Sequence, residues 1–135
     1  MSYATAQLAI EVRLATPLGS LPTQWPNGPV ITPNGAAYAE VFHLQGRASV
    51  DTLGYHGRDL IPGITQVNLY YPLATGNAAA AAAVDTFRTS FVAGQSLTNS
   101  GQAVLIRGCG PGPAKREGSY FKAIIEIQWE ARIAR

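Results

Sequence analysis

A chain of 135 residues can form one domain with a hydrophobic core but is too short for two ordinary domains, so residues 1–135 are predicted to be a single domain. Apolar residues make up 47% of the chain and charged residues 13%, about half of the ~25% usual in soluble proteins, which indicates a surface partly covered in an oligomer or assembly. The net charge of +2 does not indicate a nucleic-acid binder, and the longest apolar run, Ala78 to Val84, is too short to cross a membrane. The N-terminus lacks the basic and apolar regions of a secretory signal, so synthesis inside the cell is expected.

The first element is predicted to be a helix from about Tyr3 to Ala15, with Ser2 as its N-cap. The apolar residues at helical spacing, which are expected to face the core, are Ala4, Leu8, Val12 and Ala15. Pro17 and Gly19 are expected to end the helix.

The next segment, Thr16 to Gly35, contains five prolines, so it is expected to run extended over the domain with Trp25 as its anchor. A first strand is predicted at about Ala37 to Gln45. Both of its faces are apolar, with Ala39 and Val41 on one and Tyr38, Phe42 and Leu44 on the other. Apolar side chains on both faces of a strand indicate a subunit contact.

A long glycine-containing loop, Gly46 to Asp59, is expected to be mobile, and it leads into a strand at about Ile61 to Tyr71. The following helix is predicted to be capped by Asn77 or Thr75 and to end at Gly94. The face of this helix that is expected to be buried holds Ala80, Val84, Phe87 and Phe91.

The clearest pattern in the chain is the alternation from Tyr120 to Ile133. Its odd positions are apolar and most of its even positions are polar or charged, which predicts a long strand with one buried and one wet face. A shorter strand, about Ala103 to Arg107, and a loop, Gly108 to Gly118, are predicted to precede it.

These elements predict an α+β fold, a two-layer sandwich in which an approximately four-stranded, mainly antiparallel sheet carries both helices on one face. The sheet residues expected beneath the helices are Val67, Leu69, Ile125, Ile127 and Trp129.

No catalytic, cofactor or metal signature is found. The loop around Cys109 lacks the Gly-Lys-Ser/Thr ending of a phosphate-binding loop, and its prolines remove amide donors. Cys109 has no histidine placed by a recognisable signature, and His43 and His56 have no Cys, Asp or Glu at the spacing of a metal or nucleophile site. The chain is therefore not expected to be an enzyme.

Three stretches together resemble a known family. They are Trp25-Pro26-Asn27-Gly28-Pro29, the strand Tyr38 to Leu44, and the run from Gly63 to Pro72 with the following Gly76. With the helix and alternating strand that follow, they are similar to the tail terminator (tail completion) family of long-tailed bacteriophages. The chain departs from the family pattern after Pro29, where Val30 and a single Pro33 stand in place of an aromatic residue and a pair of prolines.

The resemblance implies a structural virion protein with no cofactor, located at the neck end of the tail. It implies a ring, typically of six copies, that caps the tail tube, ends its polymerisation and joins it to the head-side connector or stopper protein. Genomic DNA would pass through the ring with non-specific contacts at most, and no membrane is involved. The alternatives are another head–tail joining (stopper) protein, a tail tube protein, an enzyme using Cys109 or the histidines, or a small-molecule or nucleic-acid binding module.

The residues predicted to contact other subunits or partners lie on the first strand and in the two loops. They are Tyr38, Phe42, Leu44, Arg47, His56, Arg58, Lys115 and Arg116. The loop residues give both loops a positive excess, so they are expected to face an acidic tail-tube surface or DNA in the lumen, and to become ordered on assembly.

Overall fold

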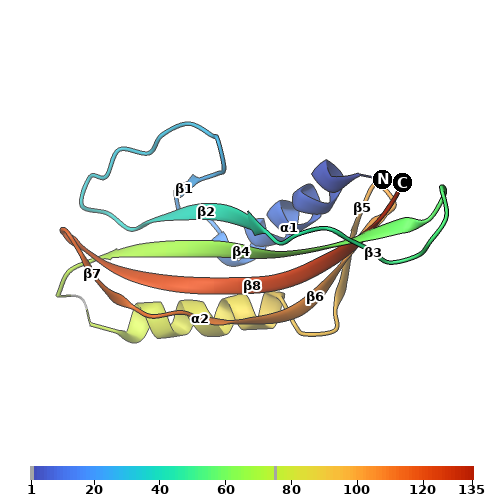
Figure 1. Ribbon diagram of the computed structural model, residues 1–135. Coiled ribbons are helices and arrows are strands. Elements are labelled where there is room, and N and C mark those ends of the chain that lie inside the picture. The colour runs from blue at the N-terminus through green and yellow to red at the C-terminus, as the bar shows by residue number, and fades with distance from the viewer. Residues whose placement is uncertain (1, 75) are drawn as a thin grey trace.

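The computed structural model describes residues 2–74 and 76–135, so the predicted cap Thr75 lies outside the described residues. The helices are α1 (Tyr3–Leu18) and α2 (Ala78–Ser90) (Figure 1). The strands are β1 (Thr23–Gln24), β2 (Tyr38–Gln45), β3 (Ser49–Val50), β4 (Arg58–Pro72), β5 (Ser96–Asn99), β6 (Gln102–Pro111), β7 (Lys115–Glu117) and β8 (Tyr120–Ala134).

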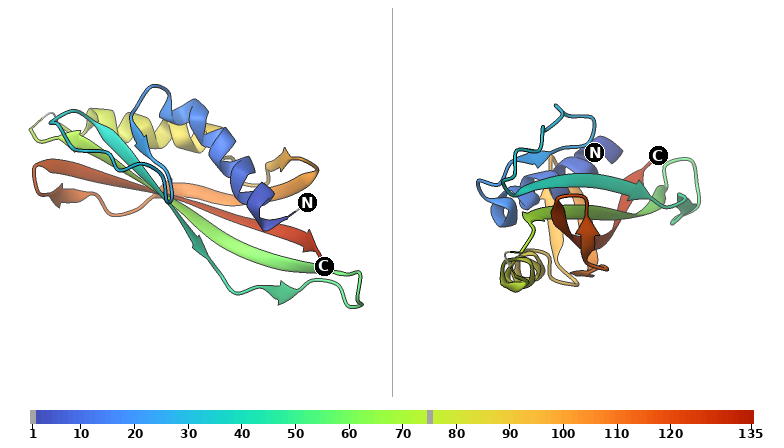
Figure 2. Two further views of the ribbon diagram at one scale, coloured as in Figure 1. Left: turned by 90° about the horizontal axis from the view of Figure 1, so that it is seen from above. Right: turned by 90° about the vertical axis from the view of Figure 1, so that its left-hand side faces the viewer.

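Within the described residues the strands form one eight-stranded sheet in the order β1-β2-β4-β8-β6-β5, with β3 added to β4 and β7 added to β8. The β1–β2 pair is parallel and the other pairs are antiparallel. The expectation of a four-stranded two-layer sandwich is therefore wrong, because the sheet is mixed, has twice as many strands and is strongly curled (Figure 2). Three of the added strands have only two or three residues and form by pairing with longer neighbours, which no sequence periodicity can mark.

The centre of the sheet is the pair β4 and β8, which stay in register from Arg58 opposite Ala134 to Pro72 opposite Tyr120. Each strand has 15 residues and so extends over about 46 Å at ~3.3 Å per residue. The molecule is consequently elongated along the direction of these two strands (Figure 1).

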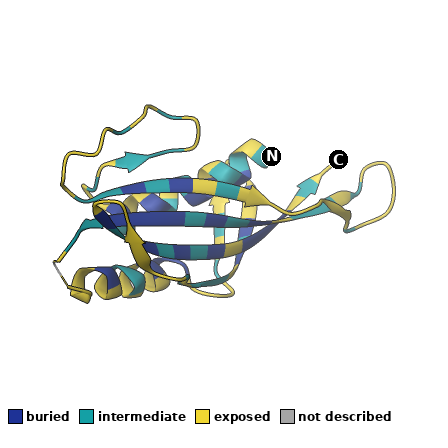
Figure 3. Ribbon diagram, turned by 60° about the vertical axis from the view of Figure 1, so that its left-hand side comes forward, coloured by how far each residue is buried: buried dark blue, intermediate teal, exposed yellow. Residues whose placement is uncertain are grey.

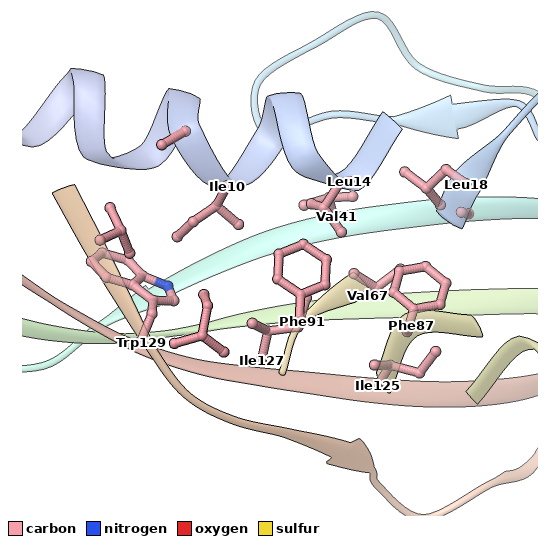
Figure 4. Packing of buried hydrophobic residues seen from close by; sticks show 14 of the residues in the cluster. Ile10, Leu14, Leu18, Val41, Val67, Phe87, Phe91, Ile125, Ile127 and Trp129 are labelled. Carbon is pink, nitrogen blue, oxygen red and sulfur yellow. The ribbon is translucent and has the colours of Figure 1, made fainter. Parts of the chain in front are cut away.

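The core lies on one face of this pair, as the alternation predicts. Ile125 and Ile127 have no exposed surface and Trp129 is 1% exposed. Both helices pack on this face, where Ile10 and Leu14 of α1 meet the sheet residues and the aromatic residues at the end of α2 (Figure 4). On α2, the predicted buried face is confirmed for Ala80, Phe87 and Phe91, whereas Val84 is half-buried.

The face predicted for α1 is wrong. Leu8 is 44% and Val12 59% exposed, and the buried residues are Ala6, Ala9, Ile10, Leu14 and Leu18. The predicted set and the observed set both recur at helical spacing, and packing on the curled sheet selects the second. The helix also continues through Pro17 to Leu18, since burial of Leu18 fixes the last turn, and Gly19 ends it. The predicted N-cap is confirmed by a hydrogen bond of 3.2 Å from the Thr5 amide to Ser2 Oγ.

The proline-rich segment after α1 contains the short strand β1, and Trp25 packs against the core as its predicted anchor. The segment then crosses toward the sheet face that the helices leave bare. There the Gly35 amide donates a hydrogen bond of 2.8 Å to the hydroxyl of Tyr120.

Candidate assembly surfaces

The first predicted contact residue, Tyr38, belongs to a cluster within the chain. Its ring stacks on Tyr70 with 4.6 Å between centroids and meets Tyr120 edge-on at 5.3 Å. The Tyr70 hydroxyl donates a 2.6 Å hydrogen bond to Glu40, and burial, together with this carboxylate, raises the pKa of Tyr70 far above its ordinary value. Much of the Tyr38 ring is therefore used inside the subunit.

The next two predicted residues, Phe42 and Leu44, lie on the sheet face opposite the helices, which we call the outer face. Phe42 is 43% and Leu44 52% exposed. Across the sheet Phe42 lies opposite Gln66 and Leu44 opposite Ile64. A groove of about 470 Å³ runs here, and its lining includes Leu44, Ile64 and the ion-paired side chains of Arg107 and Glu130, 3.4 Å apart. Phe42, Leu44 and Ile64 thus form an apolar area that the described residues of the subunit do not fully cover.

The two predicted loops lie at opposite ends of the long central strands. The segment Gly46 to Asp59 includes β3 and the start of β4, and the segment Gly108 to Gly118 includes the end of β6 and all of β7, so neither is wholly loop. Because the first segment adjoins the end of β8 and β7 in the second pairs with its beginning, Lys115 and Arg116 lie about 40 Å along the strands from the first segment. The two positive segments cannot form a single binding patch on one subunit (Figures 1 and 2).

We call residues 46–57 the arm; it projects from one end of the sheet (Figure 3). Arg135 organises it: the guanidinium donates to the carbonyl oxygens of Thr52, Gly54 at 2.6 Å and Arg58 at 3.0 Å, and pairs with the Asp59 carboxylate. Gly57 lies so close to Thr52 and Arg135 that a Cβ atom would collide with both. The arm therefore has a defined backbone shape.

Of the contact residues predicted on this segment, Arg58 pairs with Asp51 at 3.7 Å, while Arg47 and His56 are exposed. The sequence reasoning missed the tip itself, where Leu53 is 91% and Tyr55 88% exposed. The sequence did contain a signal for this surface, namely two large apolar side chains within a glycine-rich segment.

At the other end of the sheet, Lys115 and Arg116 lie exposed on β7, and neither has an ion-pair partner in the described part of the chain. Lys115 lies opposite Lys122, which pairs with Glu117 at 3.5 Å. This end is thus a small basic surface.

The remaining chemical groups are used in packing. His43 accepts or donates hydrogen bonds to Glu11 at 2.9 Å and Thr65 at 3.0 Å, and Trp129 Nε1 donates to the same Thr65 oxygen at 3.0 Å. Burial raises the pKa of the half-buried Cys109 thiol to about 11, which makes it a poor nucleophile. The described residues contain no group of three or more possible metal ligands, and none of their helices is long and apolar enough to span a membrane.

A sheet with one face bare of helices, an ordered arm and exposed apolar side chains defines a protein that works by contacts with other proteins. The family model described as "Phage tail terminator protein" matches residues 5–129. The chain belongs to this family, and it is accordingly a structural protein of the phage virion tail.

Solved structures share the fold. One superposes with a TM-score of 0.76 at 23% identity, covering 97% of this chain and 96% of the other. A second, from the virion of a native gene transfer agent particle, has a TM-score of 0.52 at 21% identity and covers 99% of this chain and all of the other. A comparison with curated protein sequences found no match.

Proposed function

We propose that copies of this chain form a closed ring, most simply a hexamer, that caps the tail tube, ends its polymerisation and presents a surface to the head-side connector or stopper protein. Membership in the tail terminator family supports a role in the tail. The main observation in support of a ring is the exposed apolar surface at Phe42, Leu44 and the arm tip, in a chain with only 13% charged residues.

The two ends of the sheet suit two different neighbours. A ring made by heterologous contacts has distinct upper and lower faces, so each subunit presents different surfaces to the tail tube, to the head side and to its neighbours in the ring. The basic surface at Lys115 and Arg116 and the arm with Arg47 lie about 40 Å apart, and we assign them to different contacts. Any contact with DNA in the lumen is to phosphates and is weak, because the genome must slide through.

The experiment measures mass and tail length together. Native mass spectrometry of the purified protein should show a closed oligomer, and host cells carrying a phage that lacks this chain should make tail tubes of uncontrolled length. Phe42→Asp combined with Leu44→Asp should abolish the oligomer while the circular dichroism spectrum stays unchanged. Tubes of normal length without the protein, or a chain that is monomeric at every concentration, would contradict the proposal.

A further inference from the structure

The arm tip has the properties of a docking element. Val50, Leu53 and Tyr55 are 60%, 91% and 88% exposed, although the backbone that carries them is held in place. Besides the Arg135 contacts, the amides of Asp51 and Thr52 donate to the Arg58 carbonyl oxygen at 3.0 and 3.1 Å. Apolar side chains carried on a fixed backbone bind at a lower entropic cost than those on a mobile loop, and on a protein surface they mark a contact site.

The charges of the arm point to a protein partner and away from DNA. Arg58 and Arg132 pair with Asp51, and Arg135 pairs with Asp59. Arg47 is left as the exposed arm cation without an ion-pair partner among the described residues. Duplex DNA would offer phosphates to one arginine and nothing apolar to Leu53 and Tyr55.

The outer face has the complementary properties. Phe42, Leu44 and Ile64 supply its apolar area, and the groove of about 470 Å³ beside Leu44 has room for an aromatic side chain. Glu126 lies in the same cross-strand row as Phe42. Gly110, the next residue in this row, has no side chain that could cover Glu126. Within the described residues no ion pair neutralises Glu126, so this face carries a free carboxylate next to its apolar area.

The tip of the arm cannot reach the outer face of its own subunit, although Gly46 at the base of the arm lines the groove. Arg135 fixes it to the end of β4 at Arg58 and Asp59, and Ile64 is six residues further along that strand, about 20 Å away. The arm also points away from the sheet (Figures 1 and 2). An occupant of the outer face must therefore come from another molecule.

We propose that the arm of one copy docks on the outer face of the next copy, with Leu53 and Tyr55 covering Phe42, Leu44 and Ile64, and with Arg47 facing Glu126. The arm and the outer face are different surfaces of the same chain, so the contact is heterologous and repeats from copy to copy. This inference rests on the proposed self-assembly and names the surfaces that carry it.

Cross-linking between two differently marked chains tests the contact directly. In a Cys109→Ser background, a Tyr55→Cys chain is mixed with a Phe42→Cys chain and treated with a short bismaleimide. We expect a cross-linked dimer in this mixture, and a ladder of oligomers when both substitutions are in one chain. The matched control pairs Tyr55→Cys with Leu8→Cys, which is an equally exposed apolar position on α1 and should give no dimer.

Charge exchange supplies an independent measurement. Arg47→Glu should raise the concentration at half-assembly about tenfold or more, because it places a second carboxylate beside Glu126, and adding Glu126→Arg to the same chain should restore assembly. Both side chains are outside the core, so circular dichroism should not change.

The outcomes separate the two proposals. Closed rings without a Tyr55–Phe42 cross-link would overturn the arm contact and leave the ring. Cross-linked linear chains would support the arm contact and contradict the ring. Unchanged assembly of Arg47→Glu, combined with weaker binding of a duplex DNA oligonucleotide, would show that the arm contacts nucleic acid and would overturn the inference.

Discussion

Replacing Gly63 by Ala tests how β4 and β8 pack at the centre of the sheet. Gly63 lies directly opposite Trp129, and a Cβ atom there would come within 2.5 Å of Cζ2 and 2.7 Å of Cε2 of the indole ring. Ordinary carbon contacts need ~3.5 Å, so the ring must move by about 1 Å. Trp129 is 1% exposed and its Nε1 is bonded to Thr65, so moving the ring disturbs buried packing and this hydrogen bond.

We expect Gly63→Ala to cost about 1 to 3 kcal/mol, the usual range for overpacking, even though alanine is otherwise favoured over glycine in a strand by ~0.5–1 kcal/mol. With a urea m-value of about 2 kcal/mol/M, the unfolding midpoint of the monomer should fall by roughly 0.5 to 1.5 M. Far-ultraviolet circular dichroism in urea, at a concentration below assembly, measures this without interference from the second tryptophan.

Gly110→Ala is the matched control. Gly110 also lies in a strand paired to β8, but a Cβ atom there meets nothing within 4 Å. Its midpoint should stay the same or rise slightly. If the two variants unfolded at the same urea concentration, the close contact between Gly63 and the Trp129 ring would not exist in solution.

Three further predictions concern the core, the arm and the thiol. Ile127→Ala should cost about 2 to 4 kcal/mol by leaving a cavity, whereas Gln128→Ala, on the exposed side of the same strand, should cost under ~0.5 kcal/mol; equal urea midpoints would show that the faces are assigned wrongly. Arg135→Ala should speed amide exchange in residues 52–58 and leave the β4–β8 core protected, and unchanged exchange there would mean that other bonds hold the arm. Alkylation of Cys109 at pH 8 should be slow in the native protein and about 100-fold faster after unfolding, since burial raises the pKa of the thiol from 9.0 to about 11 and so reduces the thiolate fraction. The alkylation rate of the native protein should rise about tenfold per pH unit between pH 8 and 10. Equal rates in the native and unfolded states would show that the thiol is exposed.

Long periodic segments were predictable because their side chains face two different environments. The alternation around Ile125, Ile127 and Trp129 fixed both the strand and its buried face, and the spacing of Phe87 and Phe91 fixed that of α2. Such patterns repeat often enough that a single exception does not hide them.

Features set by tertiary contacts were not predictable in the same way. The two residues of β3 become a strand because Leu60 and Asp59 lie beside them, and α1 faces the sheet with Ile10 in place of Leu8 because the curvature of the sheet selects it. The candidate surfaces divide similarly. Phe42 and Leu44 followed from apolar residues on both strand faces, whereas the display of Leu53 and Tyr55 depends on Arg135, which is about 80 residues away in sequence.

The uninterrupted ladder between β4 and β8 has a mechanical consequence. Its hydrogen bonds run perpendicular to the strands over 15 residue pairs, so tension applied along the strands loads all of them in shear at once. A pull across the strands would instead open them one at a time from an end. Because the arm and β7 lie at the two ends of this ladder, a force applied between those two ends would act in the direction in which the subunit resists extension best.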